Sequence, residues 1–398
     1  MLSDVIYFSM EFIQPPLMFL FIALLPCVVQ SQSLTDAKTL QTDLFTGYKK
    51  GVRPVLNQSV PLNIGINFFL SSFNSFSEVD ETLSLTAGLG LNWTDASLNW
   101  NPSSYGNLYT TIIDPVEIWT PPIFLVNRVD ALESIGSDTK FYTTLVYSGQ
   151  VIYAPGGIMN AKCPTDISKF PFDTQTCALL IVPWGITMEH LTFTPLSDKA
   201  QLGFFTPHSD WTLQGYSTTV INMNGYSTFK VDFTMKRHPL YFGVMILLPT
   251  LLFSLLNPLV FLLPVESGER VSLSMTILLS YAIFLTLVSN SIPKTSNPMC
   301  TLLIVMIVII ALSGVIVIGA IITAKYFQQD SDVKTGVLMN YIASRILKKR
   351  GNKVMPLEDK EETLTGKDFS CVLDYLFLRG TYLAIALTIL GYFLFVAI

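Results

Sequence analysis

The distribution of apolar residues divides the chain into two parts. From residue 31 to residue 237, apolar residues alternate with Thr, Ser, Asn and Gly, whereas the chain after Arg237 contains long apolar runs. A helix needs about 20 apolar residues to cross a bilayer. Runs of that kind are Leu240–Leu263, Val271–Ile292, Met299–Ile322 and Leu376–Ile398. We therefore expect four membrane-spanning helices, three within residues 239–324 and the fourth at residues 376–398.

An earlier apolar run, Leu17–Val29, is shorter than a bilayer span and leads into polar residues. This pattern is typical of the hydrophobic core of a signal peptide, to which we assign residues 1–31. No Lys or Arg precedes the run. Translation from Met10 or Met18 therefore stays open, as does a re-entrant or fifth membrane segment.

Basic residues gather between the third and fourth apolar runs, where nine Lys or Arg lie between Lys325 and Asp374. Cationic loops remain on the cytoplasmic side. Residues 325–375 are thus expected to form a short cytoplasmic loop, and residues 32–238 an extracellular domain of a multi-pass plasma-membrane protein. Sequons at Asn57 and Asn92 fall in that outer domain, where glycosylation occurs.

Short runs of alternating polarity in the outer segment predict β-strands. Examples are Thr82–Leu91, Thr143–Ile152, Ala178–Val182 and Thr228–Phe233. Turn-forming clusters separate these runs at the spacing of a β-sandwich, and Ala37–Lys49 is expected to be a helix. The predicted fold is an extracellular all-β immunoglobulin-like sandwich joined to a four-helix transmembrane bundle.

Composition excludes several classes of function. Charged residues make up 13% of the chain, hydrophobic residues 50%, and the net charge is −5. These values exclude a disordered chain and a basic nucleic-acid binder. The three histidines are scattered, and the sequence lacks the motifs of hydrolases and phosphate-binding enzymes. We expect no enzymatic activity, no metal or cofactor, and no nucleic-acid partner.

The second apolar run carries a repeated pattern at steps of four and three residues, which places its members on one helical face. The members are Ser272, Thr276, Leu279, Ile283, Thr286 and Asn290. Such a stripe is costly against lipid and must face protein or water. The four helices of one chain could hide the stripe among themselves. Alternatively, several copies of the chain could line a pore, with Leu279 and Ile283 forming apolar rings that gate by dewetting.

Two acidic residues, Glu266 and Glu269, precede this stripe on the cytoplasmic side. In a ring of subunits, Glu269 would surround the inner mouth with carboxylates and attract cations. Arg270 would then have to point away from the axis, since it would otherwise cancel that charge. The alternative is that Glu269 only anchors the helix at the membrane interface.

Cys163 and Cys177 enclose 13 residues of the outer segment and are the only cysteines assigned to it. An oxidising compartment will pair them. The enclosed loop contains Phe170-Pro171-Phe172-Asp173, a rigid turn with two aromatic rings and one carboxylate. A structural staple explains the disulfide, but it leaves unexplained why an acidic aromatic loop lies beside a membrane domain.

This loop resembles the signature of the Cys-loop pentameric ligand-gated ion channels. The resemblance of the chain to that family runs from about Asp36 to the C-terminus. The run MKRHPLYFGVMILLP entering the first span is similar to that family, and WTDASLNWNPSSYG and IWTPPIFLVNRVD are similar to its nicotinic acetylcholine receptor branch. The resemblance implies five identical or related subunits around a pore for cations. It also implies that binding is coupled to gating through the Cys-loop residues Phe170, Pro171, Phe172 and Asp173 together with Arg237.

By the same resemblance, a small-molecule agonist binds between subunits among aromatic residues that hold a cation. Trp184 and Tyr226 match a tryptophan and a tyrosine of the nicotinic branch. Tyr216 matches a further tyrosine with an offset of one or two residues, and Tyr153 is an additional candidate. Each of these aromatics could instead be an ordinary core or strand residue.

Other positions depart from the nicotinic pattern. Val126 stands where that pattern has a tyrosine, Gly88 stands where the partner face has a tryptophan, and the capping loop, residues 216–226, has no adjacent cysteine pair. These departures predict an agonist that is bulkier or more apolar than acetylcholine, as in divergent invertebrate receptors such as the chemotactile receptors of cephalopods. The alternatives are an acetylcholine-gated subunit and a non-conducting accessory subunit of a heteropentamer.

Overall fold

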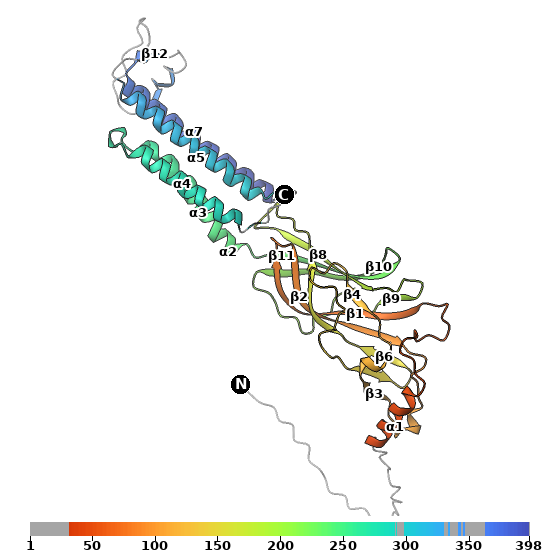
Figure 1. Ribbon diagram of the computed structural model, residues 1–398. Coiled ribbons are helices and arrows are strands. Elements are labelled where there is room, and N and C mark those ends of the chain that lie inside the picture. The colour runs from red at the N-terminus through yellow and green to blue at the C-terminus, as the bar shows by residue number, and fades with distance from the viewer. Residues whose placement is uncertain are drawn as a thin grey trace, which may run out of the picture.

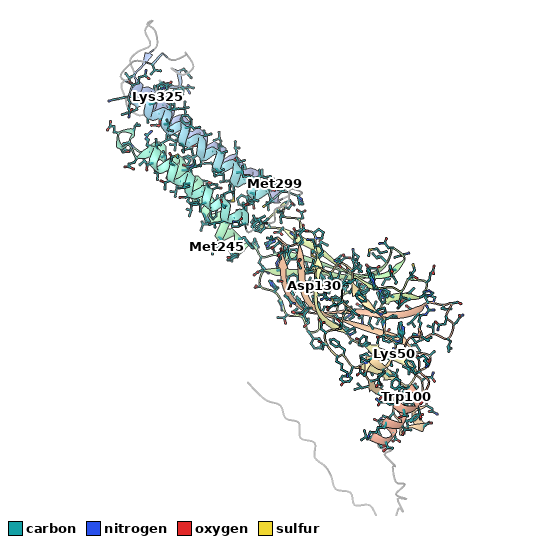
Figure 2. All side chains as sticks on the ribbon, viewed as in Figure 1. Lys50, Trp100, Asp130, Met245, Met299 and Lys325 are labelled. Atoms are coloured by element: carbon teal, nitrogen blue, oxygen red, sulfur yellow. A yellow bond between two sulfur atoms is a disulfide. The ribbon has the colours of Figure 1, made fainter. Side chains whose placement is uncertain are left out.

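The computed structural model describes residues 32–290, 292, 298–329, 333–334, 341–343, 345–346 and 363–397. The expected signal peptide lies outside these residues, as does most of the link between the second and third membrane helices. Figure 1 shows an elongated molecule with β-sheets at one end and long helices at the other. In Figure 2, Met299 lies near the junction of the two parts and Lys325 at the far end of the helices.

Helix α1 (Leu34–Phe45) begins the described chain and confirms the helix expected near residue 37. Ser33 caps it, because the Ser33 hydroxyl accepts the amide hydrogen of Asp36 while the Asp36 carboxylate accepts that of Ser33. Its buried residues Leu40 and Leu44 belong to the core of the β-region. Short 3₁₀ turns at Pro102–Ser104 and Pro115–Glu117 connect later strands.

The β-region is a sandwich of two sheets, as predicted. The larger sheet has seven strands in the order β3-β5-β6-β2-β1-β9, with β7 also pairing with β2. Its strands are β1 (Leu62–Ser77), β2 (Thr82–Thr94), β3 (Thr110–Ile113), β5 (Thr143–Val146), β6 (Gln150–Tyr153), β7 (Gly156–Lys162) and β9 (Leu191–Pro195). The run Thr143–Ile152, expected as one strand, is a hairpin of β5 and β6, because the chain reverses at Gly149 with a φ of +82°.

The smaller sheet has the order β10-β11-β8-β4. Its strands are β4 (Ile123–Leu125), β8 (Thr174–Pro183), β10 (Trp211–Met223) and β11 (Tyr226–Arg237). The two sheets share a core in which Phe68 of the larger sheet meets Phe233 of the smaller one edge to face, at 5.8 Å between ring centroids. Strand β11 leads directly into the first membrane helix.

Four helices are long and apolar enough to cross a membrane, which confirms the four expected spans. The first, Leu240–Leu262, consists of α2 (Leu240–Phe242), a π-turn (Gly243–Leu247), α3 (Leu248–Leu256) and a 3₁₀ stretch (Asn257–Leu262). The 3₁₀ stretch carries Pro258, which cannot donate a helical hydrogen bond. A 3₁₀ turn (Val265–Ser267) leads to the second span, α4 (Glu269–Asn290), and the third is α5 (Thr301–Phe327).

The fourth span is α7 (Gly366–Ala397), which lies alongside α5 (Figure 1). It begins at Gly366 rather than at Leu376, so its first turns fall within the stretch that we assigned to the cytoplasmic loop. These turns extend the helix past the apolar run because Phe369, Ser370 and Val372 are buried there. A short pair of strands, β12 (Val333–Lys334) and β13 (Thr363–Leu364), lies in the same stretch.

Candidate ligand site, coupling junction and channel face

Trp184 and Tyr226 form an aromatic pair on the outer face of the smaller sheet. Their rings stack at 6.5 Å between centroids with 12° between planes, and Phe124 of β4 lies 6.3 Å from Trp184. Strand β8 ends just before Trp184, whose amide donates to the carbonyl of Pro122 at 2.9 Å. Trp184 is nearly half exposed, so its ring presents an accessible surface, unlike a core tryptophan.

The capping loop is a tight hairpin. Strands β10 and β11 are joined by Asn224 and Gly225 alone, both with positive φ, the geometry of a type I′ turn. Met223 pairs with Tyr226 and Ile221 pairs with Thr228, so both apolar side chains lie on the face that carries Tyr226. The sequence did not single out Phe124, Ile221 and Met223 as residues on the face that carries Trp184 and Tyr226, although the Asn-Gly turn signal could have fixed the register of the hairpin.

Tyr216 does not belong to this aromatic group. It pairs with Phe233, a core residue, and packs against the core on the opposite face of the sheet from Tyr226. A β-bulge between Leu213 and Gly215 causes this placement. Counted from the Trp211–Arg237 pair without the bulge, Tyr216 would lie opposite Asp232 and face outward.

Val126 follows β4 on the edge of this sheet and is half-buried. Its amide donates to the carbonyl of Leu180 at 2.8 Å, which holds it beside β8, two residues beyond Phe124. An aliphatic side chain therefore lies at this edge of the sheet, beside β8.

Gly88 lies on the larger sheet, paired with Phe69 of β1 and Gly156 of β7. A shallow recess of about 240 Å³ opens there, and Phe69, Gln201 and Phe204 line it together with Gly88. Both phenylalanines are exposed, Phe204 almost fully. A Cβ added at Gly88 would come no closer than 3.5 Å to the carbonyl oxygen of Pro155. The recess is therefore open to a larger side chain or to a ligand.

Tyr153 does not line this recess. It pairs with Leu91, a core residue, and packs against the same core, and burial raises the pKa of its hydroxyl. Its remaining surface borders a separate hollow beside Pro115 and Lys140. Tyr153, like Tyr216, therefore packs against the core, because its strand directs the side chain to the inner face of the sheet.

The predicted disulfide between Cys163 and Cys177 is present, with the two Cα atoms 5.3 Å apart. Within the loop, Phe170, Pro171 and Asp173 are buried, while Phe172 is exposed at the surface of the chain. The peptide bond between Phe170 and Pro171 is cis. The loop thus buries the carboxylate of Asp173 and the ring of Phe170, while the ring of Phe172 points outward.

Asp173 and Arg237 form a buried ion pair at the base of the sandwich. Arg237 Nε lies 2.8 Å from Asp173 Oδ1, and Arg237 Nη2 lies 3.1 Å from Oδ2 and 2.5 Å from Glu78 Oε1. The guanidinium is 3% exposed and lies 4.3 Å from the ring centroid of Trp211. Burial works against its charge, but the hydrogen bond and charge of Asp173 and the charge of Glu78 outweigh it, and the pKa of Arg237 stays above its ordinary value.

The disulfide loop also contacts three membrane helices. Phe170 packs edge to face on Phe242 of the first span at 5.0 Å between centroids. The carbonyl of Phe170 accepts a hydrogen bond from the Tyr392 hydroxyl of α7 at 3.0 Å, and that of Ser168 accepts one from the Thr301 hydroxyl of α5 at 2.6 Å. The loop is therefore fixed to the outer ends of the bundle.

Within one chain, α4 exposes the stripe that the sequence singled out. Its six members, Ser272, Thr276, Leu279, Ile283, Thr286 and Asn290, are all exposed, whereas Arg270, Ser274, Tyr281 and Val288 are buried against the rest of the bundle. The four helices therefore do not hide the stripe. By contrast, the exposed large hydrophobic residues of α7 are Leu376, Leu383, Leu387, Leu390, Phe393, Leu394 and Phe395, which form a surface suited to lipid.

The two threonine hydroxyls of this stripe bond back to their own helix. Thr276 donates to the carbonyl of Ser272 at 2.9 Å and Thr286 to that of Ala282 at 3.0 Å. A hydroxyl whose proton is used in this way presents oxygen lone pairs outward. Such a surface offers hydrogen-bond acceptors to whatever faces it.

At the inner end of α4, Glu266 and Glu269 are exposed, while the neighbouring Arg270 is 5% exposed and paired with Asp374 of α7. Arg270 thus points into the bundle, as the sequence argument required. The only basic residue of the described segment 265–270, Arg270, is therefore turned away from the side on which the two carboxylates are exposed.

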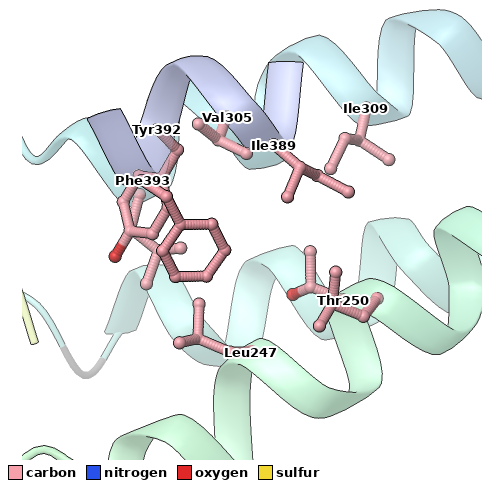
Figure 3. Close-up of a pocket in the computed structure, with 9 residues that line it drawn as sticks. Leu247, Thr250, Val305, Ile309, Ile389, Tyr392 and Phe393 are labelled. Carbon is pink, nitrogen blue, oxygen red and sulfur yellow. The ribbon is translucent and has the colours of Figure 1, made fainter. Parts of the chain in front are cut away.

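A small apolar cavity lies between the first span, α5 and α7, lined by Leu247, Val305, Ile309, Ile389 and Phe393 (Figure 3). Thr250 and Tyr392 also border it, but the Thr250 hydroxyl donates to the carbonyl of Ile246 at 2.8 Å. The cavity therefore offers a dry apolar lining inside the bundle.

Among the described residues, no group of His, Cys, Asp and Glu is arranged to hold a metal ion.

The two glycosylation sequons differ in setting. Asn57 lies in an exposed turn, where its side-chain oxygen accepts the amide hydrogen of Ser59 at 3.0 Å. Asn92 lies within β2, paired with Gly65 on one side and Ile152 on the other. Its side chain fills the space above Gly65, on the same face as Gly88.

A β-sandwich whose disulfide loop contacts three of the four membrane helices defines a membrane protein whose outer domain is packed directly against its spans. The family model for the neurotransmitter-gated ion-channel ligand binding domain matches residues 37–239, and that for the neurotransmitter-gated ion-channel transmembrane region matches residues 246–368. The chain belongs to the neurotransmitter-gated ion-channel family.

Similar proteins include acetylcholine receptor subunits of vertebrates. Acetylcholine receptor subunit alpha-1-B of Xenopus laevis is 32% identical over 72% of this chain and 63% of its own length. Acetylcholine receptor subunit alpha of Danio rerio is 32% identical over 66% and 59%, and neuronal acetylcholine receptor subunit beta-2 of Carassius auratus is 32% identical over 65% and 57%. The chain spans about three fifths of the length of these relatives.

Proposed function

We propose that the protein is a subunit of a cation channel opened by an extracellular small molecule, of the chemoreceptor type, and that it assembles as a homo- or heteropentamer. The observation that carries this proposal is the exposed stripe of α4, from Ser272 to Asn290, on the surface of a single chain. A stripe with hydroxyl groups is costly against lipid. Five copies facing a common axis would place it against water instead.

The proposed pore has an acidic inner mouth and an apolar middle. Glu269 would contribute one carboxylate from each subunit, with Glu266 nearby, which concentrates cations at the entrance. Leu279 and Ile283 would form the rings that close the pore by dewetting. The gating movement would reach α4 through the disulfide loop, where Asp173 and Arg237 join the sandwich to the first span.

The proposed agonist site combines two subunits. One subunit supplies Trp184, Tyr226 and Phe124 with the aliphatic side chains of Val126 and Ile221. The neighbour supplies the recess at Gly88 between Phe69 and Phe204. This surface has fewer aromatic walls for a quaternary ammonium and more apolar area. It therefore favours a bulky or apolar agonist over acetylcholine.

The test is voltage clamp of the full chain expressed alone, with a panel of acetylcholine and apolar ring compounds. Replacing sodium by N-methyl-D-glucamine should abolish inward current, and replacing chloride by gluconate should leave the reversal potential unchanged. Glu269→Gln should reduce inward current, while Asp368→Asn, which removes a carboxylate in the first turn of α7 that bonds to Thr365, should not. A reversal potential that follows chloride would overturn the proposal.

Two alternatives predict different results. An acetylcholine-gated subunit would give full currents with acetylcholine at micromolar concentrations in a homomer. An accessory subunit would give no current alone with any compound, but it would change the conductance of a related subunit expressed with it. The first alternative is favoured by the similarity to acetylcholine receptor subunits, and the second by the incomplete aromatic group.

A further inference from the structure

Arg270 is the second residue of α4, next to the exposed Glu269, yet its side chain runs into the bundle. Its guanidinium meets the carboxylate of Asp374 on α7 through two parallel contacts, Nη1 to Oδ1 at 2.7 Å and Nη2 to Oδ2 at 2.9 Å. Arg270 is 5% exposed, and the Asp374 side chain is also largely covered. The two-point geometry fixes both the position and the plane of the guanidinium.

The other donors of Arg270 reach two further helices. Nε donates to the carbonyl of Leu263 at 2.7 Å, where the first span ends, and Nη1 also lies 3.4 Å from the hydroxyl of Thr323 on α5. Ser370, one turn before Asp374, donates to the carbonyl of Thr323 at 2.9 Å. One side chain of α4 is therefore held by all three other helices, and Asp374 supplies the only carboxylate among these contacts.

A buried guanidinium without a counter-charge moves toward water when its linker permits. The preceding residues Ser267 and Glu269 at the α4 terminus are exposed, so they form an aqueous surface next to Arg270 on its own helix. Charges a few ångströms apart interact strongly even when partly solvated. An Arg270 released from Asp374 would therefore neutralise the carboxylate beside it, once in every subunit of the ring.

We propose that Asp374 is a positioning residue for ion conduction: its carboxylate holds Arg270 inside the bundle, and thereby keeps the inner mouth of the pore negative. This inference rests on the proposed cation channel. It assigns a role in conduction to a residue of the fourth helix that does not face the pore.

The first experiment measures single-channel currents of the full chain without agonist, in a Leu279→Ser background in which the apolar ring is removed. Asp374→Asn should lower the inward cation conductance by about twofold or more and raise chloride permeability. Arg270→Gln combined with Asp374→Asn should restore the conductance, because the released cation is gone. Asp374→Glu, and Asp368→Asn on the same helix, should conduct like the background.

A second experiment needs no current. Purified protein in lipid nanodiscs is treated with phenylglyoxal, which modifies accessible arginines, and the adduct on Arg270 is quantified by mass spectrometry. Arg270 should be protected in the unchanged chain and in Asp368→Asn, and it should be modified several-fold more in Asp374→Asn. If Asp374→Asn is poorly produced alone, mixing it with unchanged subunits supplies channels for both measurements, with intermediate conductance levels expected.

The outcomes separate this inference from the proposed function. If Glu269→Gln lowers cation conductance but Asp374→Asn does not, or if the double variant stays as low as the single one, Asp374 has no positioning role. Equal modification of Arg270 in both chains would also overturn it. If Glu269→Gln itself leaves cation conductance unchanged, the proposed role of Glu269 at the inner mouth of the pore is wrong, and the inference about Asp374 has no basis.

Discussion

Arg237 Nε lies 2.8 Å from Asp173 Oδ1, so that the last residue of β11 and the disulfide loop are joined by a buried ion pair at the entrance to the membrane. Trp211, Phe170 and Phe242 surround the guanidinium at 4.3 to 5.2 Å between its central carbon and their ring centroids. Aromatic rings rather than water therefore surround the guanidinium of Arg237. If Asp173 or Arg237 loses its charge, the remaining buried charge of the pair has no solvent to compensate for the loss.

Removing the Asp173 charge is expected to destabilise the junction strongly. Asp173→Asn should cost about 2–3 kcal/mol, less than a buried charge left with no partner, because Glu78 remains as a counter-charge to the buried Arg237 guanidinium. Thermal unfolding of the detergent-solubilised protein and surface biotinylation measure the loss. Asp166→Asn, an exposed carboxylate in the same loop, should stay within about 1 kcal/mol of the unchanged chain; equal effects of the two substitutions would contradict the prediction.

Trp184 and Tyr216 are expected to behave differently in ligand titrations. Trp184→Ala should raise the half-maximal concentration of an active compound about tenfold, since an aromatic contact worth roughly 1.4 kcal/mol corresponds to that factor. Tyr216→Phe should leave the value unchanged because Tyr216 faces the core. Dose–response curves of surface-matched variants provide the measurement, and a large shift for Tyr216→Phe would reinstate that residue as a wall of the site.

Filling the recess at Gly88 should change agonist preference. Gly88→Trp is tolerated by the backbone and places a ring between Phe69 and Phe204, which removes room for a bulky compound and adds a surface for a cation. The ratio of acetylcholine to apolar-compound sensitivity should rise about tenfold, compared by dose series on the same cells. Ile112→Trp, at an exposed position of β3, serves as the control. The recess is not part of the agonist site if both substitutions act alike.

The apolar ring of α4 is expected to hold the pore closed. Leu279→Ser should give an agonist-free current roughly tenfold above that of the unchanged chain, because a hydroxyl lets water fill the constriction. Leu387→Ser on α7 is a closely matched control, since Leu279 and Leu387 are 62% and 61% exposed in the single chain. Leu387 belongs to the surface suited to lipid, and its substitution should give no such current.

We expect Asn57 to carry a glycan and Asn92 to carry none. Asn57→Gln should remove one glycan, seen as a mobility shift that glycosidase treatment of the unchanged chain reproduces. Asn92→Gln should cause no shift, because Asn92 is paired on both sides within β2 and a glycan there would stand on the proposed subunit interface. A shift with Asn92→Gln would argue against that interface.

Patterns that depend on neighbours along the chain were predictable. The four spans, the Cys163–Cys177 disulfide and the shared helical face of the α4 stripe follow from run length, compartment and helical periodicity. The exposure of that stripe on a single chain was left open by the sequence and was decided by the packing of the four helices. The inward direction of Arg270 was expected from charge, but its partner Asp374 was not. The two residues are far apart in sequence, and only the packing of α7 against the end of α4 brings them together.

The sequence by itself determined which segments enter the membrane and which residues share a helical face, because a helix of fixed pitch needs no partner to set its spacing. It could not determine which way strand residues face, since one bulge between Leu213 and Gly215 reverses the side on which Tyr216 lies. Tertiary structure alone decided that Trp184 stacks on Tyr226, that Tyr153 packs against the core with part of its surface, and that Asp374 pairs with Arg270. Each of these outcomes depends on register and packing between distant segments.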